Sequence, residues 1–309
     1  MDRRTFLKMM GAGLAGSASG TLLKPHRSHA QEAFEGEEFF GILIDTTRCI
    51  GCRRCEKACA EVNNLPVPDI SKAANEAVFK KIRKTSVTQY TVTNLYETEK
   101  GNFFVPWRCL HCNLPACRSA CLVYALQKRT TGHVTWDTNC MGCRLCMVSC
   151  PFDIPKFEYQ KSVGNIQKCN LCYGRFHKGI VPGCVEACPT ETLMFGSRRD
   201  LLEEGWRRIS QNPDKYVNYV YGQYEVGGTS HLYLSAVPFE QIGLRMDLGV
   251  EPYPKYSLVY LNAIPFIATL TPIFMLGIAR AVRMRKEREK EEGKEKKEEK
   301  GKEEEEKHK

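Results

Sequence analysis

The chain has 309 residues, of which 16 are cysteines, and its formal net charge is +9. A chain of this length can bury a sizeable core, which argues against a small scaffold held together by disulfides. The positive charge is concentrated in residues 1–30 and 280–309, and the nearly balanced body between them argues against a nucleic-acid-binding surface.

Residues 1–30 have the features of a twin-arginine export signal. Arg3 and Arg4 precede a modest apolar stretch, and a small-x-small ending, SHA, closes at Ala30. An amphipathic N-terminal segment is the alternative. Twin-arginine export carries folded proteins, so a cysteine-rich body behind this signal indicates a cofactor that is inserted in the cytoplasm. We therefore expect residues 36–250 to form one folded domain on the periplasmic side of the membrane.

Short strands and turns separate the groups of cysteines. The stretch EFFGILIDTTRCIGC predicts a strand followed by a turn at Asp45-Thr46-Thr47. Residues 60–108 form a long insertion that contains the strand-like run VTQYTVTNLY. The stretch ALQKRTTGHVTW predicts a hairpin with Gly132 at its turn, and ACPTETLMFGSRRDL predicts one more short strand.

The cysteines fall into four quartets. The first is Cys49, Cys52, Cys55, Cys59; the second is Cys109, Cys112, Cys117, Cys121; the third is Cys140, Cys143, Cys146, Cys150; the fourth is Cys169, Cys172, Cys184, Cys188. The first and third share the spacing C-x2-C-x2-C-x3-C, and Pro151 completes the run typical of bacterial ferredoxins. In that run three cysteines bind three corners of one [4Fe-4S] cube, and the fourth cysteine reaches a neighbouring cube. The quartets are therefore expected to work in pairs.

Two other uses of the cysteines must be weighed. Zinc sites typically join two C-x2-C knuckles across a wider spacer, and only the fourth quartet fits that pattern by itself. A disulfide framework is the weaker alternative. His111 lies within the second quartet, which already has four cysteines, so a loop histidine is the expected reading. The sequence shows no Ser-His-Asp order, phosphate loop or carboxylate pair, so we expect no catalysis by the chain itself.

The stretch from Tyr256 to Ala279 contains no charged residue. As a helix rising about 1.5 Å per residue, it is long enough to cross a hydrocarbon core of about 30 Å. Arg280 and Arg283 follow at once, and positive residues next to a span stay in the cytoplasm. We therefore expect a single transmembrane helix over 256–279, rather than a buried soluble helix. Residues 280–309 would be a solvated cytoplasmic tail without chemistry of its own.

The four quartets resemble those of the four-cluster ferredoxin-type iron–sulfur (beta) subunits of membrane-bound respiratory oxidoreductases. The export signal, the stretches DTTRCIGCRRCEKAC and EVGGTSHLYLSAVPFEQIG, and the single C-terminal span look most similar to the hydrogenase-2-type (HybA-like) electron-transfer subunit. The formate dehydrogenase beta subunit is a near second. The resemblance extends over residues from about 39 to 280. It implies an α+β fold with two bacterial-ferredoxin-like dicluster units in one domain, with insertions, plus one C-terminal transmembrane helix.

The resemblance also implies four [4Fe-4S] clusters and their ligands. Set 1 would be Cys49, Cys52, Cys55, Cys188; set 2 would be Cys169, Cys172, Cys184, Cys59; set 3 would be Cys109, Cys112, Cys117, Cys150; set 4 would be Cys140, Cys143, Cys146, Cys121. Electrons would pass between a periplasmic catalytic subunit, such as a hydrogenase or formate dehydrogenase, and an integral membrane subunit that reacts with quinone or carries cytochrome b haem. The alternative function is a structural or interaction scaffold stabilised by zinc or clusters.

Overall fold

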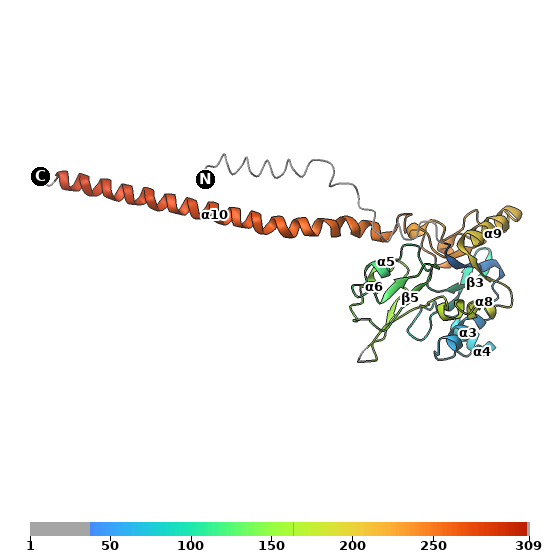
Figure 1. Ribbon diagram of the computed structural model, residues 1–309. Helices are drawn as coiled ribbons and strands as arrows, with labels where there is room; N and C mark the ends of the chain where they lie inside the picture. Colours follow the sequence, from blue (N-terminus) through green and yellow to red (C-terminus); the bar gives the residue numbers. More distant parts are fainter. Residues whose placement is uncertain (1–37, 163, 308–309) are drawn as a thin grey trace. The chain divides into compact units, whose positions relative to one another are not determined.

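The computed structural model describes residues 38–162 and 164–307, which fall into two units divided between Tyr253 and Pro254. The predicted signal peptide lies outside these ranges. The α+β arrangement is confirmed for the cysteine-bearing unit, in which short helices surround small sheets (Figure 1). Helix α10 (Tyr253–Lys307) begins at the last residue of the first unit and makes up all described residues of the second.

The main sheet has three strands in the order β8-β1-β9. Its central strand β1 (Phe40–Asp45) pairs antiparallel with β8 (Leu193–Ser197) and parallel with β9 (His231–Leu234). A central strand with both faces covered is apolar throughout, and FGILID is buried from its second residue onward. Both β1 and β8 form where the sequence predicts a short strand.

Successive residues of β1 face two different cores. Leu43 packs with residues of helix α9 (Arg198–Gln211), whereas Ile42 and Ile44 pack in a cluster that contains the buried cysteines Cys55, Cys109 and Cys184. This alternation follows from the two-residue period of a strand. The sheet is therefore the wall between α9 and the cysteine-rich interior.

The cysteine loops alternate with short elements along the chain. Before the second quartet come η1 (Thr46–Arg48), α3 (Arg54–Val62), α4 (Lys72–Val78), β2 (Val92–Thr98) and β3 (Gly101–Trp107). Then follow α5 (Ala116–Ser119), β4 (Leu126–Lys128), β5 (Val134–Trp136), α6 (Leu145–Ser149), β6 (Lys156–Phe157), β7 (Ile166–Gln167), α7 (Tyr173–Phe176) and α8 (Gly183–Glu186). The segments η2 (Glu225–Gly227) and η3 (Phe239–Ile242) flank β9.

Two of these elements test predictions made from sequence. The hairpin β4–β5 forms as predicted, with Leu126 opposite Trp136 and Gly132 at φ +86° in the turn. In the insertion over 60–108, the strand-like run is only partly a strand, because β2 begins at Val92. A tight turn, closed by a bridge between Ser86 and Gln89, occupies the start of that run.

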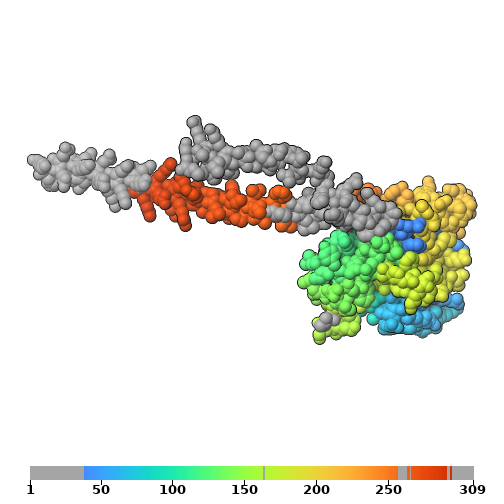
Figure 2. All heavy atoms as spheres, viewed as in Figure 1, coloured from blue at the N-terminus to red at the C-terminus, as the bar shows by residue number. Residues whose placement is uncertain are grey.

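The quartets pair through their helices. Helix α3 of the first quartet packs against α8 of the fourth, and α5 of the second packs against α6 of the third. We call the first pair module A and the second pair module B. In Figure 2 the blue residues of α3 and α4 lie beside the yellow-green residues of the fourth quartet, whereas the green residues of module B form a neighbouring region of the same surface.

Helix α10 contains one stretch, Phe266–Lys290, that is long and apolar enough to cross a membrane. It overlaps the predicted span over 256–279. Its large apolar side chains are exposed, including Phe266, Leu270 and Phe274. A helix with this much uncovered apolar surface is stable where lipid or another protein covers it.

Candidate metal centres

The same backbone feature occurs in the first loop of every quartet. The residue before the second cysteine has a positive φ in all four: Gly51 at +69°, His111 at +49°, Gly142 at +75° and Leu171 at +55°. Glycine adopts this left-handed conformation freely, whereas other residues lose roughly 1–2 kcal/mol in it. His111 and Leu171 are almost fully buried, at 0 % and 1 % exposure, so their packing holds the conformation.

The first and third quartets share a spacing but end differently. Helices α3 and α6 both begin after an arginine with positive φ, Arg53 and Arg144. Helix α3 continues through Cys59, whereas α6 ends at Ser149 and leaves Cys150 extended, with ψ 114°. The following proline explains the difference, because it disfavours the helical conformation of the residue before it.

Set 1 gathers around a single cavity. Cys49, Cys52 and Cys55 of the first quartet line it together with Cys188 of the fourth. Four sulfur atoms converge here without a carboxylate or imidazole among the lining residues. This donor set fits an iron–sulfur cube, which takes one thiolate at each iron.

Set 4 gathers in the same way in module B. Cys140, Cys143 and Cys146 line a second cavity together with Cys121. Leu126, Trp136 and Ile166 form its apolar wall. The structure thus brings the last cysteine of the second quartet to the first three of the third.

The cysteines of sets 2 and 3 line neither of these cavities. In set 2, burial raises the pKa of Cys59 to about 12, and the nearby thiolate charges of Cys184 and Cys172 add to the rise. Cys169 belongs to the same group of neighbours. Burial is the largest cause of its raised pKa, and the charge of Cys59 is the second largest.

Set 3 lies in module B. Burial raises the pKa of Cys112, and the charges of Cys150, Cys109 and Cys117 follow as causes. Each expected set is therefore a group of neighbours in the structure.

The electrostatics of the thiols favour a positively charged ligand. Burial raises the pKa of Cys49 to about 12 and that of Cys55 to about 11, so these thiols are protonated at neutral pH unless a cation replaces the proton. Cys188 differs: burial acts to raise its pKa, but backbone N–H groups of Leu193 and Thr190 outweigh burial and lower it.

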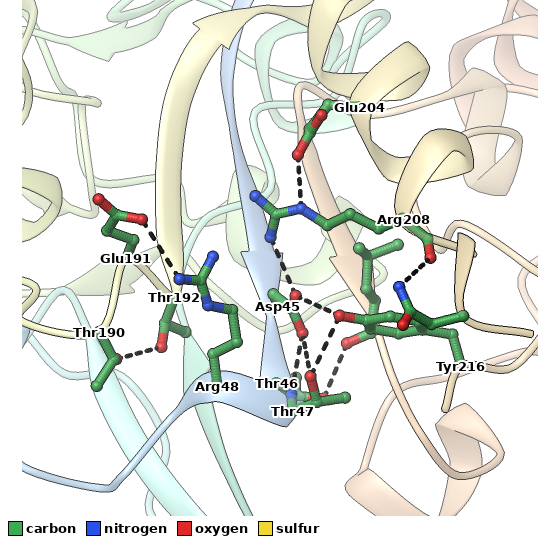
Figure 3. Close-up of polar contacts among 12 residues, drawn as sticks. Asp45, Thr46, Thr47, Arg48, Thr190, Glu191, Thr192, Glu204, Arg208 and Tyr216 are labelled. Atoms are coloured by element: carbon green, nitrogen blue, oxygen red, sulfur yellow. Dashed lines mark hydrogen bonds and ion pairs between the residues drawn. The ribbon is translucent and has the colours of Figure 1, made fainter. Parts of the chain in front are cut away.

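The support of the set 1 cavity is visible in Figure 3. Asp45, the last residue of β1, accepts hydrogen bonds from Thr47 N–H at 3.1 Å, Arg208 Nη1 at 3.0 Å and the Tyr216 hydroxyl at 2.9 Å. Thr46 donates to the Leu234 carbonyl at 2.8 Å. These bonds fix the chain immediately before Cys49.

A second group of contacts links the two loops that meet at this cavity. The exposed ion pair between Arg48 and Glu191, at 3.3 Å, joins the loop of Cys49 to the loop of Cys188. Thr190 and Thr192 share a hydrogen bond at 2.8 Å on the same loop. Set 1 is thus held from both sides by ordinary protein contacts.

His111 has a structural role in the described part of the chain. Its ring is fully buried, its Nδ1 accepts the Val134 N–H at 2.9 Å, and it stacks on His231 with centroids 5.1 Å apart. These contacts connect the second quartet to β5 and β9.

Sequence reasoning missed three buried cations. Arg108 donates to Cys184 Sγ at 2.8 Å, Lys168 donates to the Cys169 carbonyl at 2.9 Å, and Lys128 donates to the Cys112 carbonyl at 3.0 Å. Arg108 and Lys168 each stand directly before the first cysteine of a quartet. A basic residue at that position is the signal that could have indicated them.

Comparison with known proteins shows which protein family this chain resembles. A family described as "4Fe-4S dicluster domain" matches residues 41–122, and a second family of that description matches residues 101–198. A protein of Nitratidesulfovibrio vulgaris strain Hildenborough is 44% identical over 296 residues, which cover 93% of this chain and 78% of that protein.

Two relatives have informative names. The hydrogenase-2 operon protein HybA of Escherichia coli O157:H7 is 32% identical over 276 residues, covering 79% of this chain and 84% of HybA. The iron–sulfur subunit of the nitrate-inducible formate dehydrogenase of E. coli K12 is 33% identical over 243 residues, covering 74% of this chain and 80% of the relative. The chain therefore belongs to the family of ferredoxin-type iron–sulfur subunits of oxidoreductase complexes.

This membership confirms several expectations. The fold is built on dicluster ferredoxin units, the cofactors are 4Fe-4S clusters, and the chain is a non-catalytic electron-transfer subunit. Among the described residues, one helix is also long and apolar enough to cross a membrane.

Proposed function

We propose that this subunit relays electrons through four [4Fe-4S] clusters, between a periplasmic catalytic subunit and a membrane subunit that is quinone-reactive or carries haem. The observation that carries the proposal is the grouping of all sixteen cysteines into sets 1 to 4, with two sets in each module. When bound, each cluster supplies a one-electron redox group.

The order of the sets supports a relay in series. Burial raises the pKa of Cys55 in set 1 to about 11, and the charge of Cys184 in set 2 adds to that rise. The charge of Cys109 in set 3 likewise raises the pKa of Cys169 in set 2. The charge of Cys146 in set 4 raises the pKa of Cys117 in set 3. Neighbouring sets are thus close enough for their charges to interact, in the order 1, 2, 3, 4.

The two ends of this series reach the surface. Beside set 1, Ile50 is 59 % exposed, and beside set 4, Met141 is 61 % exposed next to the exposed Cys143. In contrast, Leu110 and Leu171, which lie in the loops of sets 3 and 2, are 1 % exposed. Apolar burial excludes water from the inner sets, and the outer sets are the places where electrons can enter and leave.

The orientation in the membrane follows from the ends of the chain. The twin-arginine signal over 1–30 supports export of the folded unit, and Arg280 and Arg283 support a cytoplasmic location for residues 280–309. The exposed apolar side chains of α10 support a transmembrane anchor between them.

Redox coupling to quinone tests the relay against a purely structural use of the clusters. The complex purified from membranes is reduced with dithionite and mixed with a menaquinone analogue, while cluster absorption is followed. We expect rapid reoxidation, and we expect Cys146→Ala to abolish reoxidation while the clusters of module A keep their EPR signals. Clusters that stay reduced in the wild-type complex would favour the scaffold.

Protease accessibility tests the orientation separately. Trypsin added to spheroplasts should digest the cysteine-bearing unit, and trypsin added to inverted vesicles should remove only the Lys-rich tail. The opposite pattern would contradict the periplasmic location while leaving the relay itself intact.

A further inference from the structure

Arg108 is buried with unused hydrogen-bonding capacity. It is 0 % exposed, its Nη1 donates to Cys184 Sγ at 2.8 Å, and its Nε and Nη2 have no protein partner. Within the described part of the chain Arg108 forms no ion pair with a carboxylate. An isolated buried charge is very unfavourable, so a buried arginine is normally paired.

A second buried arginine shows what ordinary pairing looks like in this protein. Arg53 is 2 % exposed, and its guanidinium bonds Glu56 at 3.0 Å, the Asp69 carbonyl at 2.9 Å and Asn75 Oδ1 at 3.0 Å. Its charge is therefore balanced by protein groups. The charge of Arg108 is not.

The groups close to Arg108 include cysteines of two different sets, beside the buried Tyr233 and His231. Burial raises the pKa of Cys55 in set 1 to about 11 and that of Cys59 in set 2 to about 12, and the charge of Arg108 opposes both rises. The charge of Arg108 also acts to lower the pKa of Cys172 in set 2, against the rise that burial causes. Arg108 thus lies at the junction between sets 1 and 2, although the next residue, Cys109, belongs to set 3.

We propose that Arg108 is the counter-charge of the first two clusters, with Nη1 bonded to the Cys184 thiolate and the free Nε–H and Nη2–H groups donating to cluster sulfur. This inference rests on the proposed function. A cube held by four thiolates gains one negative charge when it takes up one electron. A fixed cation beside it stabilises the reduced form and raises the reduction potential, and low polarity around the site limits screening.

The position of Arg108 makes the two ends of the relay different. Its charge acts on the two clusters of module A and favours the residence of electrons there. Lys168, the equivalent residue before the fourth quartet, already bonds the Val134 and Cys169 carbonyls. The two basic residues are therefore not interchangeable, and Arg108 is the one whose donors remain available to a cluster.

The test is a potentiometric EPR titration of the full-length, cluster-loaded protein, with dithionite as the electron source. In Arg108→Gln we expect wild-type iron and acid-labile sulfide, with two reduction steps moved to lower potential and the other two unchanged. The expected shift is at least tenfold in the equilibrium constant, which is about 59 mV for one electron. Arg108→Lys keeps the charge and should shift both steps less.

Arg207→Gln is the control, because Arg207 pairs with Glu204 on the exposed side of α9 and should move no step. Unchanged potentials in a fully loaded Arg108→Gln protein would overturn the proposal, as would equal shifts in the Gln and Lys variants. If Arg108→Gln loses clusters, retention in Arg108→Lys would still support a counter-charge, and loss in both would overturn it. A wild-type chain without iron and sulfide would instead contradict the proposed function.

Discussion

Modules A and B each contain one quartet with the spacing C-x2-C-x2-C-x3-C, but the two modules have very different supports. Module A is backed by the sheet of β8, β1 and β9 and by α9, and the large apolar core on one side of that sheet extends from Ile42 to Leu248 and also contains Cys109 and Leu110 of the second quartet. Module B relies on two-stranded sheets and helices of four or five residues. Its own buried core is Cys117, Leu126, Val134, Cys146 and Ile166, so two of the five core residues are expected ligands.

This difference shows that cysteine loops of one kind can belong to modules whose folds rely on bound clusters to different degrees. A small core supplies little stability by itself, and metal ligation then takes over that role. We therefore expect module A to stay folded when clusters are absent, and we expect the part of module B around Cys117, Leu126, Val134, Cys146 and Ile166 to depend on them.

The largest expected effect is the response to iron removal. After oxidative chelation, we expect amide protection in module B to collapse, at Val134 for example, while Leu43 in β1 stays protected. Hydrogen exchange followed by mass spectrometry measures both. Equal loss of protection in the two modules would show that the sheet of module A does not provide independent stability.

The next effect concerns the support beneath set 1. Asp45→Ala removes a fully buried carboxylate and leaves Arg208 and Tyr216 without their shared acceptor. We expect a loss of about 3 kcal/mol in the free energy of unfolding, since breaking a buried ion pair strands the remaining charge. Chemical denaturation of the loaded protein measures it. A loss below about 1 kcal/mol would mean that Glu204, the other partner of Arg208, is a sufficient replacement.

A matched glycine pair compares the two modules at equivalent positions. Gly51 and Gly142 have φ of +69° and +75°, but a Cβ added at Gly51 would lie 2.5 Å from Phe104, against 3.3 Å from Phe157 at Gly142. Gly142→Ala should lose roughly 1 kcal/mol from strain, and Gly51→Ala roughly 2–3 kcal/mol because a clash is added. Thermal unfolding of both variants measures the difference. Equal losses would mean that Phe104 moves aside freely.

The smallest effect is expected at the rim of set 1. Glu191→Gln removes the exposed ion pair with Arg48, whose two side chains are 77 % and 35 % exposed. Exposed pairs contribute between about 0 and 1 kcal/mol, and salt screens them. We expect a change below about 0.5 kcal/mol that vanishes at high salt. A larger change would show that the link between the loops of Cys49 and Cys188 holds the cavity together.

The parts of the fold that the sequence predicted are local. The strand over Phe40–Asp45, the hairpin around Gly132 and the cysteine quartets all leave short-range patterns of apolar alternation, turn residues or spacing. The positive φ at Gly51 and Gly142 is also typical of glycine.

The parts that could not be predicted depend on contacts between distant residues. Nothing local in EVGGTSHLYLSAVPFEQIG shows that His231–Leu234 adds to β1 as a parallel strand. The left-handed backbone at His111 and Leu171 is imposed by burial rather than by residue type. The bond from Arg108 to Cys184 joins residues of different quartets, so spacing within a quartet could not reveal it.

The central claim, four clusters in series, is tested most directly by iron and acid-labile sulfide per chain, together with EPR of the dithionite-reduced protein. Four cubes require about sixteen irons per chain and matching sulfide, and their proximity in the order 1 to 4 predicts interacting EPR signals. An iron content near three cubes or fewer in fully assembled protein, or four clusters that do not interact magnetically, would contradict this account.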